Sequence, residues 1–132
     1  MDFIDIKILG VEKEAIEKDN SFEQAYKYPY LLSEKPDDLW IKFFHSLYRL
    51  HSYDKKRQYT IIDRHIVAII SAEDKRQQFL DFLKDVVNST NQKYREMLSA
   101  KAQEKHKEEA RKKREEEKIR ELREETDHLG FF

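Results

Sequence analysis

The chain has 132 residues, and its 26 Lys and Arg side chains nearly balance its 27 Asp and Glu side chains, so no global field draws it towards nucleic acid or anionic lipid. It contains no cysteine, which excludes disulfide bonds, thiolate zinc sites and cysteine nucleophiles. The first residues lack the basic charge of a secretory signal, and no apolar run approaches the roughly 18 residues that span a bilayer, so we expect a soluble cytoplasmic protein with no membrane partner.

The first expected element is a strand over residues 2–9, where apolar and polar side chains alternate as in a strand with one solvated face. Its apolar positions are Ile4, Ile6 and Ile8. A second strand is expected over residues 22–32, and its shared face carries Tyr26, Tyr28, Tyr30 and Leu32. Because Pro29 has no N–H for the ladder, we expect this strand at a sheet edge, or at least with Pro29 facing outward.

A helix is expected from the segment around Pro36 to about Tyr53. Proline is tolerated in the first turn of a helix, and Asp37 and Asp38 suit the positive end of the helix dipole. Apolar side chains then recur every three or four residues and form one broad face that can pack on a sheet. They are Leu39, Trp40, Phe43, Phe44, Leu47, Tyr48 and Leu50.

Residues 59–62 and 65–70 predict a β-hairpin, because both segments are rich in β-branched side chains and Asp63-Arg64 supplies the turn. We expect this hairpin at the centre of the sheet. A final helix is expected to begin at Ser71 or Ala72 and to cover the same sheet with one apolar face. That face comprises Phe79, Phe82, Leu83, Val86, Val87, Tyr94, Met97 and Leu98.

These elements predict an α+β fold of ββαββα order. It has a small antiparallel four-stranded sheet with helices on one face, and its last helix is extended as a long charged C-terminal rod. We expect three segments: a small α+β domain over residues 1–98, a charged single-helix extension over residues 99–127, and an apolar C-terminal peptide over residues 128–132. The rod is expected to be continuous because no proline or glycine occurs between Ala72 and Thr126.

The charged extension is predicted to be a solvated helix and not a coiled coil. Residues 101–125 contain ten Lys or Arg and nine Glu, so the apolar a and d positions of a coiled coil are missing there. Opposite charges stand four residues apart instead, as in Glu108 with Lys112 and Glu116 with Arg120. Each such pair stabilises an isolated helix by about 0.2–0.5 kcal/mol.

Apolar character returns at the C-terminal end, where the candidate partner-binding side chains are Ile119, Leu122, Leu129, Phe131 and Phe132. The last five residues, His128-Leu129-Gly130-Phe131-Phe132, resemble the peptide with which bacterial DNA polymerases and repair proteins dock on the sliding clamp. Leu129 and Phe132 occupy the two anchoring positions of that pattern, while His128 stands in place of Gln and Phe131 in place of Leu. The resemblance implies insertion of a terminal peptide into a preformed pocket. A different partner, or packing of the tail on the protein's own domain or on another copy, is left open.

No cofactor or metal site is expected. The two glycines lie 120 residues apart, at Gly10 and Gly130, so a glycine-rich phosphate loop is excluded. No two of the five histidines stand four residues apart, and no zinc-type constellation appears. No triad of nucleophile, base and acid can be proposed from residue spacing, and we therefore do not expect an enzyme, although an enzyme of unrecognised type stays open.

Nucleic-acid binding is the main rival interpretation. Lys55, Lys56 and Arg57 lie between Tyr53 and Tyr59, so the cations could contact phosphates while the tyrosines stack on bases. Elsewhere acidic residues flank the basic runs and cancel much of their field, so direct binding is not favoured.

The leading hypothesis is a non-catalytic interaction or adaptor subunit of a larger assembly. The small domain would dock on a protein partner or form a homodimer, and the charged helix would carry the apolar C-terminal peptide as a second attachment point. Two attachments on one chain raise the effective concentration of each without any new contact. The alternative is an accessory DNA- or RNA-binding protein that docks on a sliding clamp through the C-terminal pentapeptide.

Overall fold

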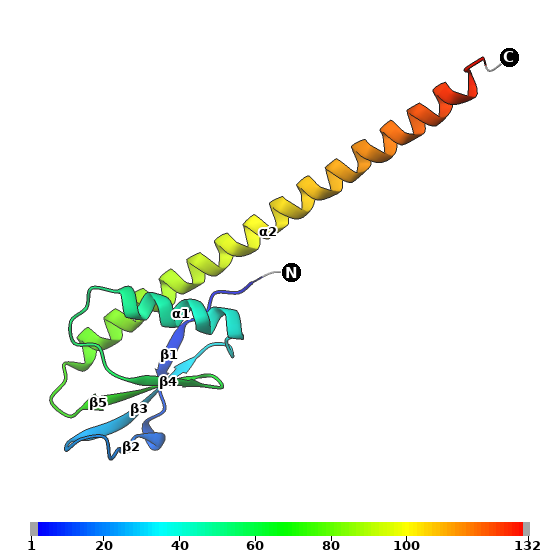
Figure 1. Cartoon of the computed structure of the whole chain (residues 1–132). Coiled ribbons are helices and arrows are strands. Elements are labelled where there is room, and N and C mark those ends of the chain that lie inside the picture. The colour runs from blue at the N-terminus through cyan, green and yellow to red at the C-terminus, as the bar shows by residue number, and fades with distance from the viewer. Residues whose placement is uncertain (1–2, 131–132) are drawn as a thin grey trace. The chain divides into compact units, whose positions relative to one another are not determined.

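The computed structural model describes residues 3–130 and confirms an α+β fold with an antiparallel sheet and helices on one of its faces (Figure 1). The sheet has five strands, one more than expected, because a two-residue strand adds to it. The elements in chain order are β1 (Ile8–Val11), the 3₁₀ turn η1 (Lys13–Ala15), β2 (Glu17–Lys18), β3 (Ala25–Leu32), α1 (Asp38–Leu50), β4 (Tyr59–Ile62), β5 (His65–Ser71) and α2 (Arg76–Asp127). The chain divides into an N-terminal unit that ends at Arg95 and a C-terminal unit that begins at Glu96.

The strands lie in the order β1-β3-β5-β4, and β2 also pairs with β3. The predicted hairpin is confirmed: Ile62 pairs with His65 across the two-residue turn, where Asp63 has a φ of 52°. Aspartate is one of the few residues that adopt this left-handed conformation with little strain. The expected place of the hairpin is wrong in part, because β5 is an inner strand and β4 lies at the edge.

The strand that contains Pro29 is not an edge strand, since β3 lies between β5 on one side and β1 with β2 on the other. Leu32 N donates to Arg64 O at 2.7 Å, so Leu32 is a hydrogen-bonded position of the ladder between β3 and β5. Because such positions alternate along an antiparallel pair, Pro29, three residues earlier, directs its backbone N and C=O away from β5. On that side Pro29 O accepts from Glu12 N at 3.0 Å, and the missing N–H falls where β1 has ended and β2 has not begun. The short break between two strands therefore lets proline occupy an inner strand.

The first strand begins later than expected, at Ile8 and not at residue 2. Ile6 is buried, yet its backbone does not join the sheet. Ile6 N donates to Asn91 Oδ1 at 3.1 Å, and Ile6 O accepts from Asn91 Nδ2 at 2.8 Å. A side-chain amide of α2 thus replaces the neighbouring strand for this segment.

Both helices begin at recognisable signals. Asp37 is the N-cap of α1, and its Oδ1 accepts from Trp40 N at 2.8 Å. Helix α2 begins at Arg76, later than the expected Ser71 or Ala72. The preceding turn is closed by Asp74, whose N donates to Ser71 O at 3.0 Å and whose Oδ2 accepts from Ser71 N at 2.9 Å. The acidic residue that was expected inside the helix therefore orders the turn before it.

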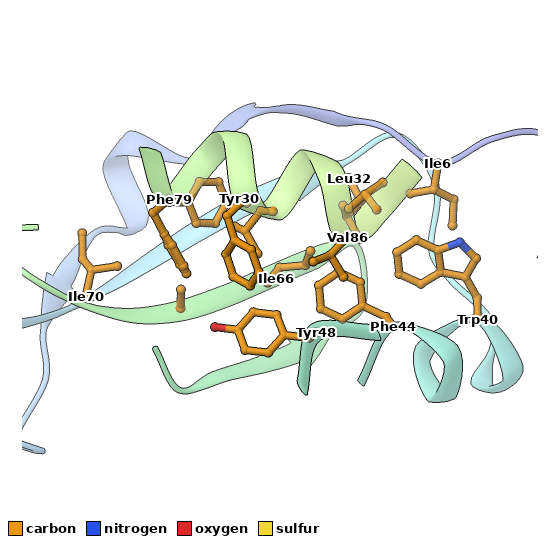
Figure 2. Packing of buried hydrophobic residues seen from close by; sticks show 14 residues of the cluster. Ile6, Tyr30, Leu32, Trp40, Phe44, Tyr48, Ile66, Ile70, Phe79 and Val86 are labelled. Carbon is orange, nitrogen blue, oxygen red and sulfur yellow. The ribbon is translucent and has the colours of Figure 1, made fainter. Parts of the chain in front are cut away.

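The core of the N-terminal unit is formed by the inner sheet face, α1 and the first turns of α2 (Figure 2). Aromatic rings dominate it: Trp40 stacks on Phe44 at a centroid distance of 5.5 Å, and Tyr48 lies 5.0 Å from Phe82. Burying one large side chain of this kind contributes roughly 1.5–3 kcal/mol. Thr90 and Asn91 are also buried, although their polar side chains were not assigned to the apolar face of this helix.

Candidate functional site

Three aliphatic side chains at the C-terminal end form the candidate partner-binding surface, which we call the C-terminal stripe: Ile119, Leu122 and Leu129. Ile119 and Leu122 are each 49% exposed, and Leu129 is 58% exposed. A spacing of three residues places Ile119 and Leu122 on one side of the helix α2. Ile119 and Leu122 therefore share one face of α2, and Leu129 follows beyond the end of the helix.

The backbone forms a turn beyond the last residue of α2. Leu129 N donates to Thr126 O at 3.2 Å, and Thr126 Oγ1 donates to Leu122 O at 2.7 Å. A shallow hollow beside the stripe is lined by Ile119, Leu122, Arg123, Thr126 and Asp127. Phe131 and Phe132, the other predicted anchors, lie outside the described residues.

The charged part of α2 neutralises much of its own field. Arg111 bonds Glu108 at 2.5 Å and Glu115 at 2.7 Å, and Lys118 lies 3.8 Å from Glu121. The hydrogen bond and the charge of Arg111 lower the pKa of the Glu108 carboxyl. Since the side chains of residues 101–130 are exposed, these pairs act in water, and the apolar stripe is the chemically distinct part of this surface.

The predicted nucleic-acid contacts Lys55, Lys56 and Arg57 do not form one continuous basic surface. Arg57 makes a bidentate pair with Asp74, in which Nε and Nη2 lie 2.8 and 2.6 Å from the two carboxylate oxygens. Lys56 Nζ donates to Arg49 O at 2.9 Å. Lys55 lines a small hollow together with Glu73 and Asp74, which belong to the turn before α2. Two of the three cations are thus used in contacts that hold the loop before β4.

The Arg57–Asp74 pair lies near a cluster of tyrosines in the core. Burial raises the pKa of Tyr48 to about 12, although the Arg57 N–H, which donates to the Tyr48 hydroxyl at 3.0 Å, acts in the opposite direction. Burial also raises the pKa of Tyr30 and of Tyr59. These neutral phenols pack against aromatic rings, and the arrangement supports a structural role for them.

A second apolar surface lies on the sheet face opposite the helices, and sequence reasoning missed it. We call it the outer-face groove; it has a volume of about 310 Å³ and is lined by Ala15, Glu17, Lys27, Pro29, Ile62, Asp63, His65 and Val67. The sequence did carry a signal for it. Strand β5 is apolar on both faces, with Ile66, Ala68 and Ile70 inward and Val67 and Ile69 outward. A strand with one solvated face would alternate instead.

Other exposed aliphatic side chains are dispersed. Ile4, Leu9 and Leu50 are 71%, 60% and 75% exposed, and they belong to three different elements or segments. Single exposed apolar residues are ordinary on protein surfaces. The C-terminal stripe differs because two of its members, Ile119 and Leu122, share one face of an otherwise charged helix.

The described part of the chain holds neither a metal-binding cluster nor a membrane-spanning helix. Within residues 3–130, no three His, Asp or Glu side chains come close enough together to hold a metal ion. In the same range, no helix has both the length and the apolar character needed to cross a membrane.

Comparison of the chain with models of protein families, with curated proteins and with solved structures gives no match. The function therefore has to be inferred from the surfaces of the chain itself.

Proposed function

We propose that this chain is a non-catalytic interaction subunit of a larger cytoplasmic assembly, and that the C-terminal stripe is one of its attachment points. The observation that carries this proposal is the half-exposure of Ile119 and Leu122 on one face of a charged helix. A partner that covers this face removes apolar surface from water, as in helix-in-groove recognition.

The size of the stripe limits the affinity that it supplies. Complete burial of one aliphatic side chain contributes about 1.5–3 kcal/mol, and half of the surface of these residues is already covered, so the three together contribute roughly 2–5 kcal/mol. Association itself costs several kcal/mol in lost freedom of motion. The stripe alone thus gives weak binding, and a second attachment through the N-terminal unit raises the effective concentration to a useful level.

The charges beside the stripe supply orientation. Arg123 and Asp127 line the same hollow as Ile119 and Leu122, and they carry opposite signs. A partner groove with an acidic group near Arg123 and a basic group near Asp127 would bind the helix in one direction only. Rim charges of this kind affect specificity and association rate more than affinity.

The test compares two double variants of the full chain in a quantitative pull-down. Ile119→Ala with Leu122→Ala removes the stripe, whereas Glu117→Ala with Glu124→Ala changes the opposite face of the helix. Alanine is the best helix former, so neither change weakens α2. We expect recovery of the same partners to fall at least about tenfold for the first variant and to stay unchanged for the second.

Equal recovery with both variants would show that the stripe is not an attachment point. A third chain, ending at Asp127, removes Leu129 and the terminal aromatic residues while leaving Ile119 and Leu122 in place. Loss of partners in this chain alone would assign the attachment to the terminal peptide and would contradict attachment through the helical residues.

A further inference from the structure

Strand β4 leaves part of its backbone directed away from the sheet. It lies at the end of the strand order and pairs only with β5 among the strands of residues 3–130. Ile69 N donates to Gln58 O at 2.8 Å, and this bond fixes the phase of the ladder. In an antiparallel pair the bonded positions alternate, so the N–H and C=O groups of Tyr59 and Ile61 point outward.

The two edges of the sheet differ in their protection. On the far side, the register of β1 shifts between Ile8 and Gly10, and β2 has only two residues, both charged. Irregular register, short strands and charges are features that prevent edge-to-edge pairing. Strand β4 is also short, with four residues, but its sequence Tyr-Thr-Ile-Ile carries no charge and its register with β5 is regular.

The side chains next to this edge also favour coverage. Ile62 is 54% exposed and lines the outer-face groove together with Pro29 and Val67. Thr60 is exposed on the same face of β4. A strand added beside β4 would bond with Tyr59 and Ile61 and would cover part of Ile62, so main-chain bonding and apolar burial would occur together.

We propose that the occupant of this edge is β4 of a second copy, which pairs with it antiparallel about a two-fold axis and joins the two sheets into one. A two-fold contact requires a surface that is complementary to itself. An uncharged strand meets this condition, because the copies bring no like charges together at the axis. The inference stands apart from docking through the C-terminal stripe.

The charges beyond the ends of β4 fit the same arrangement. The basic segment 55–57 precedes the strand, and Asp63 follows it; the Asp63 side chain is 76% exposed and lies 3.8 Å from Lys35 of the same chain. Antiparallel alignment sets the segment before β4 in one copy beside the turn after β4 in the other. Since Arg57 and Lys56 are held by Asp74 and the Arg49 carbonyl, Lys55 is the cation that Asp63 of the second copy approaches at each end of the interface. This is the complementarity that favours a second copy as the partner.

Sedimentation of the full chain over about 1 μM to 1 mM tests the proposal. We expect a reversible dimer. Thr60→Lys combined with Ile62→Lys places like charges opposite one another near the axis, and should raise the dissociation constant at least about tenfold. The control is Leu9→Lys, which adds one positive charge at an exposed aliphatic position on the other edge and should leave the dimer unchanged.

Hydrogen exchange supplies a test that needs no variant. The amides of Tyr59 and Ile61 should exchange more slowly at high protein concentration than at low concentration, because pairing protects them. A monomer at every concentration overturns the proposal and leaves the edge to a strand of another protein. A dimer that survives the β4 change but is lost with Ile119→Ala and Leu122→Ala also overturns it, since association would then occur through the C-terminal stripe. Failure of stripe docking leaves the β4 result unaffected.

Discussion

Trp40 Nε1 donates a hydrogen bond to Asn91 Oδ1 at 2.9 Å, and both side chains are buried. The same asparagine bonds the N–H and the C=O of Ile6. One amide therefore connects α2 with α1 and with the N-terminal segment that precedes the sheet. Since each of its partners is a polar group in an apolar core, the amide completes bonds that no water would replace there.

Replacement of Asn91 by alanine is expected to be strongly destabilising. The change leaves the Trp40 N–H and the two backbone groups of Ile6 without their partner, and each buried unsatisfied group costs about 1–3 kcal/mol. We therefore expect the free energy of unfolding to fall by about 3 kcal/mol or more, measured by denaturant unfolding. Asn88→Ala, at an exposed position one turn earlier on the same helix, should change it by less than about 0.5 kcal/mol.

Asn91 also marks a limit of sequence reasoning. The helix was correctly expected to bury Phe79, Phe82 and Val86, because these residues follow the helical period. A polar residue on the same face gives no sign of whether it points to solvent or completes a buried bond, since the partner lies 51 or 85 residues away. Periodicity identifies the face of a helix, but long-range hydrogen bonds depend on the assembled fold.

The pair between Arg57 and Asp74 should make stability depend on pH in acid. Burial alone would raise the pKa of Asp74, but the hydrogen bonds from Arg57 and from the Ser71 N–H, with the charge of Arg57, outweigh it and lower this pKa. A carboxyl with a lowered folded-state pKa stabilises the fold above its unfolded value of about 3.9, and this contribution is lost as pH falls through the folded value.

Asp74→Asn should accordingly lower the free energy of unfolding at pH 7 by about 1–2 kcal/mol. The difference from the parent chain should shrink as the pH falls below about 4, because the parent loses the same contribution. The control is Glu73→Gln, an exposed neighbour in the same turn. An Asp74→Asn difference that keeps its full size at pH 2 would show that the ionised pair is not its cause.

The buried tyrosines predict a second pH effect, in alkali. Burial raises the pKa of Tyr48 to about 12 and raises those of Tyr30 and Tyr59. A raised pKa stabilises the fold fully below the unfolded value of about 10, and the contribution is lost as pH rises through the folded value. Titration by tyrosinate absorbance should show these three ionising well above the unfolded value of about 10, or together with unfolding. Ionisation of Tyr30, Tyr48 and Tyr59 in the native protein at the ordinary pKa of about 10 would contradict this packing.

The C-terminal unit should be helical without support from the core of the N-terminal unit. Ala110→Pro removes a backbone donor in the middle of the charged segment and costs about 3 kcal/mol of local helix stability. Helical circular dichroism should fall, while the unfolding temperature of the N-terminal unit should change little; Ala110→Gln is the control. A parallel fall of that temperature would mean that the two units unfold together.

The candidate surfaces were predictable to different degrees. Ile119, Leu122 and Leu129 stand out in the sequence because apolar residues follow a long charged run. The edge of β4 could not be recognised in the same way. The hairpin was evident from its turn, but the neighbours of its two strands depend on how β3 inserts between β1 and β5. The inner position of Pro29 was missed for the same reason, because it depends on a break between two strands.

Site-specific photo-crosslinking in cells tests the central claim, attachment through the C-terminal stripe, most directly. A photoreactive amino acid is placed at Leu122 in one full-length chain and at Glu124, on the opposite side of α2, in another. We predict a discrete crosslinked product from position 122 that is absent from position 124 and disappears when Ile119 is changed to lysine. No product at position 122, or equal products from both positions, would contradict the account.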